Sequence, residues 1–257
     1  MSARYAVYLC PDPSGPAWAA GAEWLGYCAA TGERRRQPAI PGIAPALLRA
    51  LTAAPRRYGF HATLKAPFHL APGAGRARLA RLLREVAAAE HAFDGPSFGV
   101  RLLGGFLALS PDYPDARLDG LAARCVVVFD ELRAALGAEE LARREGQGLS
   151  GAQRALLRRW GYPYVMSEFR PHYSLTGGLA PYEEGVVERL AEHAGRHFEG
   201  AASALRRIEC VALFEERAPG AGFRLLEHAS LRRGGARADA KLKHAAGSVA
   251  PCSSSKT

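Results

Sequence analysis

The sequence predicts an α+β fold built from two similar halves, and three observations lead to this prediction. A histidine, one spacer, a small hydroxyl residue and a leucine occur twice, and the two histidines lie 172 − 61 = 111 residues apart. A loop containing proline or glycine and then an amphipathic run follow each motif. A strand-like segment follows each amphipathic run. The repeated set is 61–64, 76–91 and 97–103 in the first half, and 172–175, 181–198 and 204–213 in the second.

Seven segments rich in β-branched, leucine and aromatic residues predict strands. Pro67 is expected to end the strand that carries the first motif, because proline cannot donate to a strand ladder. A hairpin is expected around the Pro219–Gly220 turn, which joins the last two segments. The predicted strands are 4–10, 56–64, 97–103, 106–109, 164–175, 204–215 and 222–231.

Apolar residues at helical spacing predict six helical segments. One of them contains the β-favouring run CVVVF at 125–129, but charged residues at helical spacing on both sides favour a helix there. Another is interrupted at 146–150 by glycine and serine, and it forms the expected connection between the halves. The predicted helices are 17–30, 45–54, 76–91, 115–136, 139–160 and 182–198.

These elements predict two lobes, an N-terminal one at 1–138 and a C-terminal one at 139–231. The last stretch, 232–257, has few apolar anchors and several basic residues, and we expect a disordered basic tail. No apolar run approaches the roughly 20 residues that span a bilayer, and the N-terminus is not typical of a signal peptide. We therefore expect a cytoplasmic protein without membrane contact, and the sequence leaves its oligomeric state open.

The composition favours anionic partners without identifying them. The formal net charge is +9, from 34 Lys and Arg against 25 Asp and Glu. Such a balance suits nucleotides, RNA or phosphorylated metabolites, but it also occurs in proteins that bind none of these. The five cysteines are scattered and form no C-x-x-C pair. We therefore expect neither a disulfide framework nor a metal site, and no cofactor.

The twin motifs are the candidate active site. Side chains two residues apart on a strand point to the same face, so His61 shares a face with Thr63 and His172 with Ser174. The same alternation predicts Lys65 beside the first pair and Arg170 beside the second, although both could equally be charges at the rim. Two proton carriers, two hydroxyl donors and fixed positive charge suit the cleavage of a phosphate ester.

The fuller contexts RYGFHATLKAPF (57–68) and FRPHYSLTG (169–177) resemble the 2H phosphoesterase superfamily, which includes RNA 2′,3′-cyclic phosphodiesterases. They are most similar to the branch encoded near carbon–phosphorus lyase genes, often labelled as phosphonate-metabolism proteins. The resemblance covers residues 4–231. It implies a bilobal, pseudo-twofold fold in which two antiparallel sheets face each other across a cleft, with helices outside.

The resemblance also implies a metal-independent phosphodiesterase that hydrolyses a small cyclic phosphate or a phosphorylated sugar or nucleotide. One imidazole would take a proton from water and the other would protonate the departing oxygen. The sequence does not decide which histidine has which role. Two alternatives remain: a 2′,3′-cyclic phosphodiesterase acting on RNA ends, and a protein that binds a nucleotide or RNA in the same cleft without turnover.

Overall fold

Residues 3–233, the part of the chain that the computed structural model describes, contain nine strands in two antiparallel sheets. The larger sheet has seven strands in the order β4-β5-β6-β2-β1-β8-β9, and β3 and β7 form the smaller one. The strands are β1 (Arg4–Leu9), β2 (Ala62–His69), β3 (Phe93–Asp94), β4 (Phe98–Leu103), β5 (Phe106–Pro111), β6 (Tyr173–Ser174), β7 (Arg207–Ile208), β8 (Cys210–Glu216) and β9 (Arg224–Ser230).

Helices surround this sheet on both sides. Within the described residues, none is long and apolar enough to cross a membrane. The α-helices are α1 (Pro16–Leu25), α2 (Pro45–Leu51), α3 (Ala53–Arg56), α4 (Arg76–Ala89), α5 (Ala116–Asp130), α6 (Ala138–Glu145), α7 (Gly151–Trp160), α8 (Glu184–Phe198) and α9 (Ala202–Arg206). Two 3₁₀ turns, η1 (Met166–Glu168) and η2 (Glu199–Ala201), complete the set.

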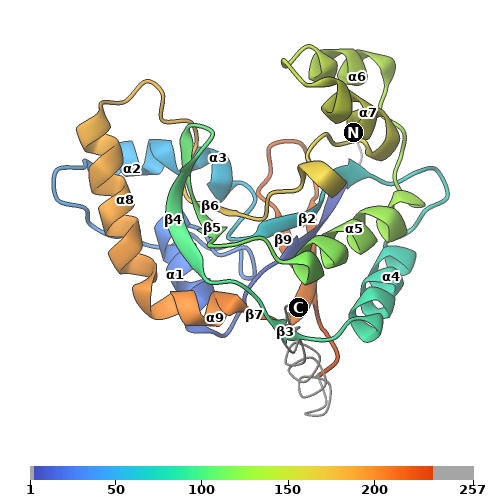
Figure 1. Ribbon diagram of the computed structural model, residues 1–257, viewed down its shortest axis with the longest axis horizontal. Helices are drawn as coiled ribbons and strands as arrows, with labels where there is room; N and C mark the ends of the chain where they lie inside the picture. The colour runs from blue at the N-terminus through green and yellow to red at the C-terminus, as the bar shows by residue number, and fades with distance from the viewer. Residues whose placement is uncertain (1–2, 234–257) are drawn as a thin grey trace, which may run out of the picture.

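The sheet has two parts, each with its own helices. Figure 1 shows α1, α2, α3, α8 and α9 gathered on the side of β4, β5 and β6, and α4 and α5 on the side of β2 and β9. Contacts of α5 with β2, of α4 with β8 and β9, and of α8 and α9 with β4 agree with this view. Helices α6 and α7 project from one end of the second part.

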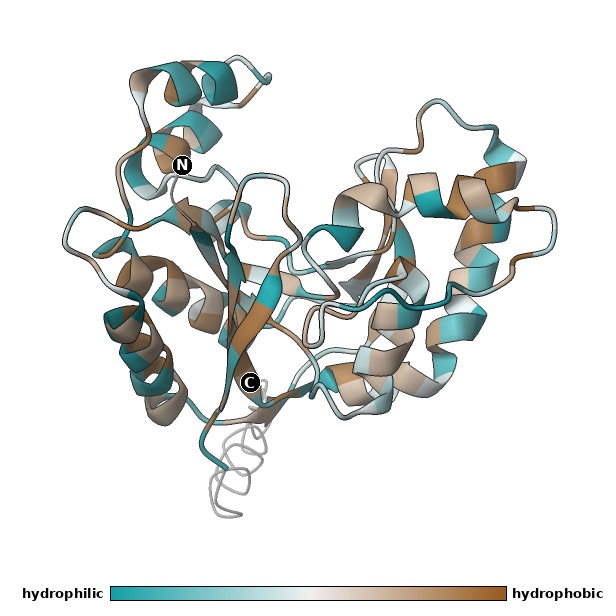
Figure 2. Cartoon of the chain, turned by 180° about the vertical axis from the view of Figure 1, so that it is seen from behind, coloured by the Kyte–Doolittle hydropathy of each residue, from teal (hydrophilic) through white to brown (hydrophobic). Residues whose placement is uncertain are grey.

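Hydrophobic side chains of both parts meet in a shared core. In Figure 2 the strands are largely hydrophobic, and the helices have hydrophilic residues on their outer faces. Val7, Leu9, Leu64 and Leu213 pack in the large core cluster, which also contains side chains of α4 and α5. The opposite side of β1 carries Ala6, Tyr8 and Cys10 into a second, smaller cluster. Strand β1 is therefore buried on both faces.

A change of register between β1 and β2 reverses the alternation of side chains along β2. Tyr8 lies opposite Thr63, whereas Val7 lies opposite Lys65, so Leu64 has no partner of its own on β1. Such a bulge re-aims the side chains that follow it. Thr63 therefore shares the face of Tyr8, and Lys65 shares the face of Val7, which packs towards the core under α5.

The two parts of the sheet join through very few residues. Strand β6 pairs with β2 at Ala62 and Tyr173, and with β5 at Tyr173 and Ser174. This narrow join lies between the two motifs. The fold consequently brings the motifs side by side, although they are 111 residues apart in the chain.

The α+β class is confirmed, and one finer expectation needs correction. The strands expected in two facing sheets are hydrogen-bonded into one seven-stranded sheet. The expected lobe boundary at residue 138 stays a prediction; strands from its two sides pair with one another, β8 with β1 and β6 with β5. The expected tail stays a prediction, because 234–257 lie outside the described residues; of its first two residues, Arg232 forms a bridge with His91.

The motif strands also differ from their expected bounds. The first begins at Ala62, after α3 and a tight turn, and runs through Pro67 to His69. Pro67 is tolerated inside it because it lies in the second of two register irregularities along β2, where no ladder hydrogen bond is required. The second strand is reduced to Tyr173–Ser174, and η1 occupies part of the segment before it.

Candidate active site

His61 is positioned by the turn between α3 and β2. Gly59 has φ 77°, in the left-handed region, and a Cβ there would lie 2.7 Å from the Cβ of Ala29. Glycine is therefore required by the backbone and by Ala29. The Nδ1 atom of His61 lies 2.9 Å from the Gly59 carbonyl oxygen.

His172 is held in the same way. Its Nδ1 atom lies 2.7 Å from the carbonyl oxygen of Arg170, also two residues earlier in the chain. In the neutral ring, an Nδ1–H that donates to a carbonyl leaves the lone pair on Nε2. Both imidazoles thus have the same tautomer, with Nε2 available for proton transfer.

The join between β2 and β6 brings the four motif side chains together. Ala62 and Tyr173 are opposite one another and both point into the large core cluster. Extending this register by one residue in each direction places His61 opposite Ser174, and Thr63 opposite His172. The hydroxyl of Thr63 also lies 3.3 Å from Nε2 of His61. Each imidazole therefore has the hydroxyl of the other motif as its neighbour across the strands.

The half-buried side chains of His61, Thr63, His172 and Ser174 line a cavity of about 670 Å³, which we call the twin-histidine cavity. This volume lies in the range of small-molecule sites. Six rings from distant parts of the chain contribute to its wall: Tyr8, Tyr58, Phe106, Tyr162, Tyr164 and Phe169. A cavity with a polar floor and an aromatic wall can hold a phosphate together with a sugar or a base.

Tyr8 supports His61 directly. Its ring stacks on the imidazole with a centroid distance of 3.8 Å and an interplanar angle of 27°. Its hydroxyl is buried and has no hydrogen-bond partner among the described residues. Burial raises the pKa of this phenol well above its ordinary value, so Tyr8 is a neutral support for His61.

The cavity also holds both imidazoles in the neutral form. The pKa of His61 is lowered to about 4, chiefly by burial and also by the nearby His172, against the effect of the Gly59 carbonyl. Burial likewise lowers the pKa of His172, and the Arg170 carbonyl opposes this change. At neutral pH the free protein therefore presents two neutral imidazoles.

The two cationic candidates have different positions. Arg170 lines the twin-histidine cavity with an exposed side chain. Lys65 lies outside it, because the bulge at Leu64 turns this side chain away. Its ammonium group lies 2.9 Å from Asp130 and 3.1 Å from the carbonyl oxygen of Val126 on α5. Lys65 therefore joins β2 to α5 and does not face the two histidines.

The lining of the twin-histidine cavity contains no aspartate, glutamate or cysteine among the described residues. Hard divalent cations prefer carboxylate oxygens, so this set of side chains does not form a typical cage for them. Elsewhere in the described residues, Cys10, Cys210 and His228 bring ligand atoms within 4.8 Å of one another, which could hold a metal ion. This group is not part of the cavity.

Sequence reasoning did not find the aromatic wall. Tyr8 and Tyr58 were assigned only to predicted strands, 4–10 and 56–64. Tyr8 becomes a cavity residue through its pairing with Thr63, which is a tertiary contact. The cluster of tyrosines at 162 and 164, just before the second motif, was the one local signal that could have indicated a binding wall.

Two curated relatives are similar to most of this chain. A protein of Janthinobacterium sp. (strain Marseille) named ribose 1,5-bisphosphate phosphokinase PhnN is 43% identical over 221 residues, which are 86% of this chain and 49% of that protein. A protein of Laribacter hongkongensis (strain HLHK9) with the same name is 38% identical over 222 residues, 86% of this chain and 50% of that protein. The chain spans about half the length of these relatives.

A protein-family model matches residues 63–224, a segment that begins at Thr63 and includes the whole second motif. This segment covers more than half of the chain and most of the seven-stranded sheet. The chain belongs to the family described as "Protein of unknown function (DUF1045)".

Proposed function

We propose that this protein hydrolyses a cyclic phosphodiester on a small phosphorylated sugar or nucleotide, with His61 and His172 as the acid–base pair. The observation that carries the proposal is the symmetry of the site. Both imidazoles bind a carbonyl two residues earlier through Nδ1 and line one small cavity together with Thr63 and Ser174. A site that only binds phosphate has no need of two matched titrating groups.

The reaction follows from these positions. A neutral imidazole accepts a proton through Nε2 from a water molecule whose oxygen attacks phosphorus. The ester bond to the leaving oxygen breaks, and the other imidazole, protonated, donates its Nε2 proton to that oxygen. The product is a phosphomonoester with a free hydroxyl, and the two histidines end with their protonation states exchanged. We assign His61 as the base because its pKa of about 4 keeps it neutral.

The hydroxyls and Arg170 complete the proposed machinery. Negative charge collects on the non-bridging oxygens as the water attacks, and the hydroxyls of Thr63 and Ser174 donate hydrogen bonds there. Arg170 provides fixed positive charge at the cavity wall. No step requires a metal ion, so the activity is expected to persist in EDTA.

The names of the relatives support a phosphorylated sugar as the substrate class. The relatives act, by name, as kinases of ribose 1,5-bisphosphate. We do not propose kinase activity for this chain, because it matches only half of each relative and its sequence contains no Gly-Lys dipeptide. A P-loop kinase requires that dipeptide in its phosphate-binding motif. We place the reaction in phosphonate metabolism, as the resemblance of the motifs implies.

Phosphorus NMR of a substrate panel in the presence of EDTA tests this function. The panel contains 2′,3′-cyclic nucleotides, ribose cyclic phosphates and oligonucleotides that end in a cyclic phosphate. We expect wild type to convert at least one of them, and His61→Ala and His172→Ala each to lose roughly 10²–10⁴-fold in rate. The exposed His91→Ala variant is the matched control and is expected to keep the activity.

Two results would contradict the proposal. Activity that EDTA abolishes would show that a metal ion performs the chemistry. Binding of a cyclic nucleotide by the double variant His61→Ala, His172→Ala, combined with no turnover by wild type, would show a binding protein instead.

A further inference from the structure

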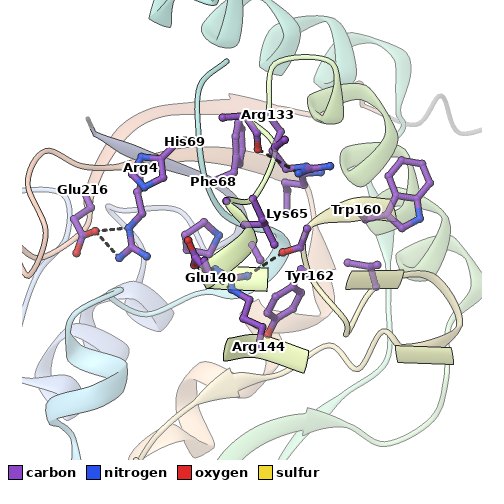
Figure 3. Close-up of a pocket in the computed structure, with 18 of the residues that line it drawn as sticks. Arg4, Lys65, Phe68, His69, Arg133, Glu140, Arg144, Trp160, Tyr162 and Glu216 are labelled. Atoms are coloured by element: carbon purple, nitrogen blue, oxygen red, sulfur yellow. Dashed lines mark hydrogen bonds and ion pairs between the residues drawn. The ribbon is translucent and has the colours of Figure 1, made fainter. Parts of the chain in front are cut away.

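A second pocket, which we call the basic pocket, adjoins the twin-histidine cavity. It has a volume of about 510 Å³. Five cationic side chains line it, and they come from β1, β2 and the segments around α3, α5 and α6. Figure 3 shows Arg4, Arg133 and Arg144 placed around Lys65, with Trp160 and Tyr162 at one side. The five cations are Arg4, Arg57, Lys65, Arg133 and Arg144.

Positive charge exceeds negative charge in this pocket. Two of the three carboxylates that neutralise it are each shared by two cations, which leaves 5 − 3 = 2 positive charges in excess. The pairs are Arg4 and Arg57 with Glu216, Lys65 and Arg133 with Asp130, and Arg144 with Glu140. The Arg4 and Arg144 side chains are only 25% and 21% exposed, so their charges are weakly screened by solvent.

The part of the basic pocket that Arg4 forms lies on the same face of the sheet as the two histidines, whereas Lys65 reaches the pocket from the opposite face. On β1, Arg4, Ala6 and Tyr8 alternate with core residues and share one face. Across this face Tyr8 lies opposite Thr63, and Arg4 lies opposite both His69 and Glu216. The four residues from Tyr8 to Arg4 correspond to roughly 13 Å along the strand. The two sites are thus separated by about the length of a small sugar or nucleotide.

The two pockets also share a wall. Ala66, Pro67, Tyr162 and Val165 line both of them. A molecule whose cyclic phosphate lies against His61 and His172 can therefore extend along this wall until its far end reaches the arginines. Guanidinium groups bind phosphoryl oxygens through paired N–H donors, which gives the arginines a preference for such an end group.

We infer that the basic pocket binds a second phosphoryl group, carried at the far end of the same substrate molecule. The inference rests on the proposed function, because it extends the substrate of the twin-histidine cavity. It assigns the substrate class: a small molecule with a cyclic phosphodiester at one end and a phosphomonoester at the other. Arg4 and Arg144 are the principal binding residues, because their side chains are 25% and 21% exposed, whereas those of Lys65 and Arg133 are only 3% and 13% exposed.

A pair of substrates that differ in one group tests the inference. Uridine 2′,3′-cyclic phosphate is compared with the same nucleotide carrying a 5′-phosphate, and kcat/KM is measured for both. In wild type the 5′-phosphate is expected to raise kcat/KM by roughly 10- to 100-fold, the range of a charged hydrogen-bonded contact. Free phosphate at high concentration is expected to reduce this advantage, because it competes for the same pocket.

Arg144→Met is the first variant, since Glu140 retains Arg143 as an ion-pair partner. It is expected to bring the ratio of the two kcat/KM values towards one, and Arg4→Met is the second variant with the same expectation. Arg84→Met is the matched control. Arg84 also pairs with a glutamate, Glu227, but is exposed and lies outside both pockets, so the ratio should stay at the wild-type value.

Calorimetry with His61→Ala separates this inference from the proposed function. Tighter binding of the 5′-phosphorylated nucleotide that depends on Arg144, without turnover by wild type, would uphold the basic pocket and overturn the hydrolase. Equal kcat/KM values for the two nucleotides in wild type would overturn the basic pocket and uphold the hydrolase. Failure to bind or convert either nucleotide would overturn both.

Discussion

The two imidazoles at the site are held neutral by the protein, and this sets the expected chemistry. Burial lowers both pKa values, and the ring of Tyr8 covers one face of His61. A bound phosphodiester brings a negative charge next to both rings and opposes this effect. In the proposed reaction, the substrate therefore helps to create the protonated histidine that serves as the acid.

This arrangement predicts different pH profiles for kcat/KM and kcat. In the free enzyme the base must be neutral and the acid protonated, and the protonated acid is lost as pH rises through a pKa below the ordinary 6.5. We expect kcat/KM to be highest between about pH 4, the pKa of His61, and the lowered pKa of His172, and to fall about tenfold per pH unit above the pKa of His172. The kcat profile should lie at higher pH, because the bound anion raises both pKa values.

Steady-state kinetics from pH 4 to 9 measure both profiles. A kcat/KM that rises through pH 7 would contradict the assignment, since it would require a base with a pKa much higher than that of His61.

The individual residues also show what could be predicted from the sequence. His61, Thr63, His172 and Ser174 were found because the reacting groups repeat in a local pattern. Tyr8 could not be found, because its position beside His61 depends on which strand pairs with which and in what register. The local sequence pattern predicts the proposed reacting groups, whereas the aromatic residues around them depend on which strands pair in the fold.

At the level of elements, the bulge in β2 directs the side chains of Thr63 and Lys65 to opposite faces of the strand. Thr63 faces the twin-histidine cavity, and two positions later Lys65 reaches α5. Simple alternation had placed Lys65 with the substrate. A sequence pattern assumes a regular strand, so one unpaired residue, Leu64, was enough to reverse the prediction.

Lys65→Met is accordingly expected to affect stability. The variant loses the hydrogen bonds to Asp130 and Val126, while Asp130 keeps Arg133 at 2.7 Å. We expect the free energy of unfolding to fall by about 1.5–3 kcal/mol, the range for hydrogen bonds to charged groups. Urea denaturation measures this change.

Arg84→Met is the control for that experiment, because an exposed ion pair contributes less than about 1 kcal/mol. An unchanged unfolding free energy for Lys65→Met, together with a raised KM, would show that Lys65 serves the substrate instead.

At the level of the whole molecule, strands from both halves of the sequence repeat pair in one seven-stranded sheet. The part of the sheet that contains β2 takes strands from both ends of the described chain, because β8 and β9 extend it beyond β1. The internal repeat predicted the order of strands and helices well. It could not predict which strands pair, since both halves offer similar apolar segments and pairing is decided by long-range contacts.

The size of the twin-histidine cavity predicts its response to substrate length. About 670 Å³ accommodates a small ligand, and the adjoining basic pocket accepts one further charged group. We expect kcat/KM for oligonucleotides that end in a 2′,3′-cyclic phosphate not to exceed that of the 5′-phosphorylated mononucleotide. Kinetics with chains of increasing length test this, and a steady rise with length would support the RNA-end alternative.

The central claim is that water attacks phosphorus, and oxygen-18 labelling tests it most directly. The reaction is run in H₂¹⁸O with a cyclic phosphate substrate, with and without ATP, and the product is analysed by mass spectrometry. The account predicts one oxygen-18 atom on the phosphoryl group of the product and the same rate with or without ATP. A product formed only with ATP, without oxygen-18 and with release of ADP, would show phosphoryl transfer and contradict the account.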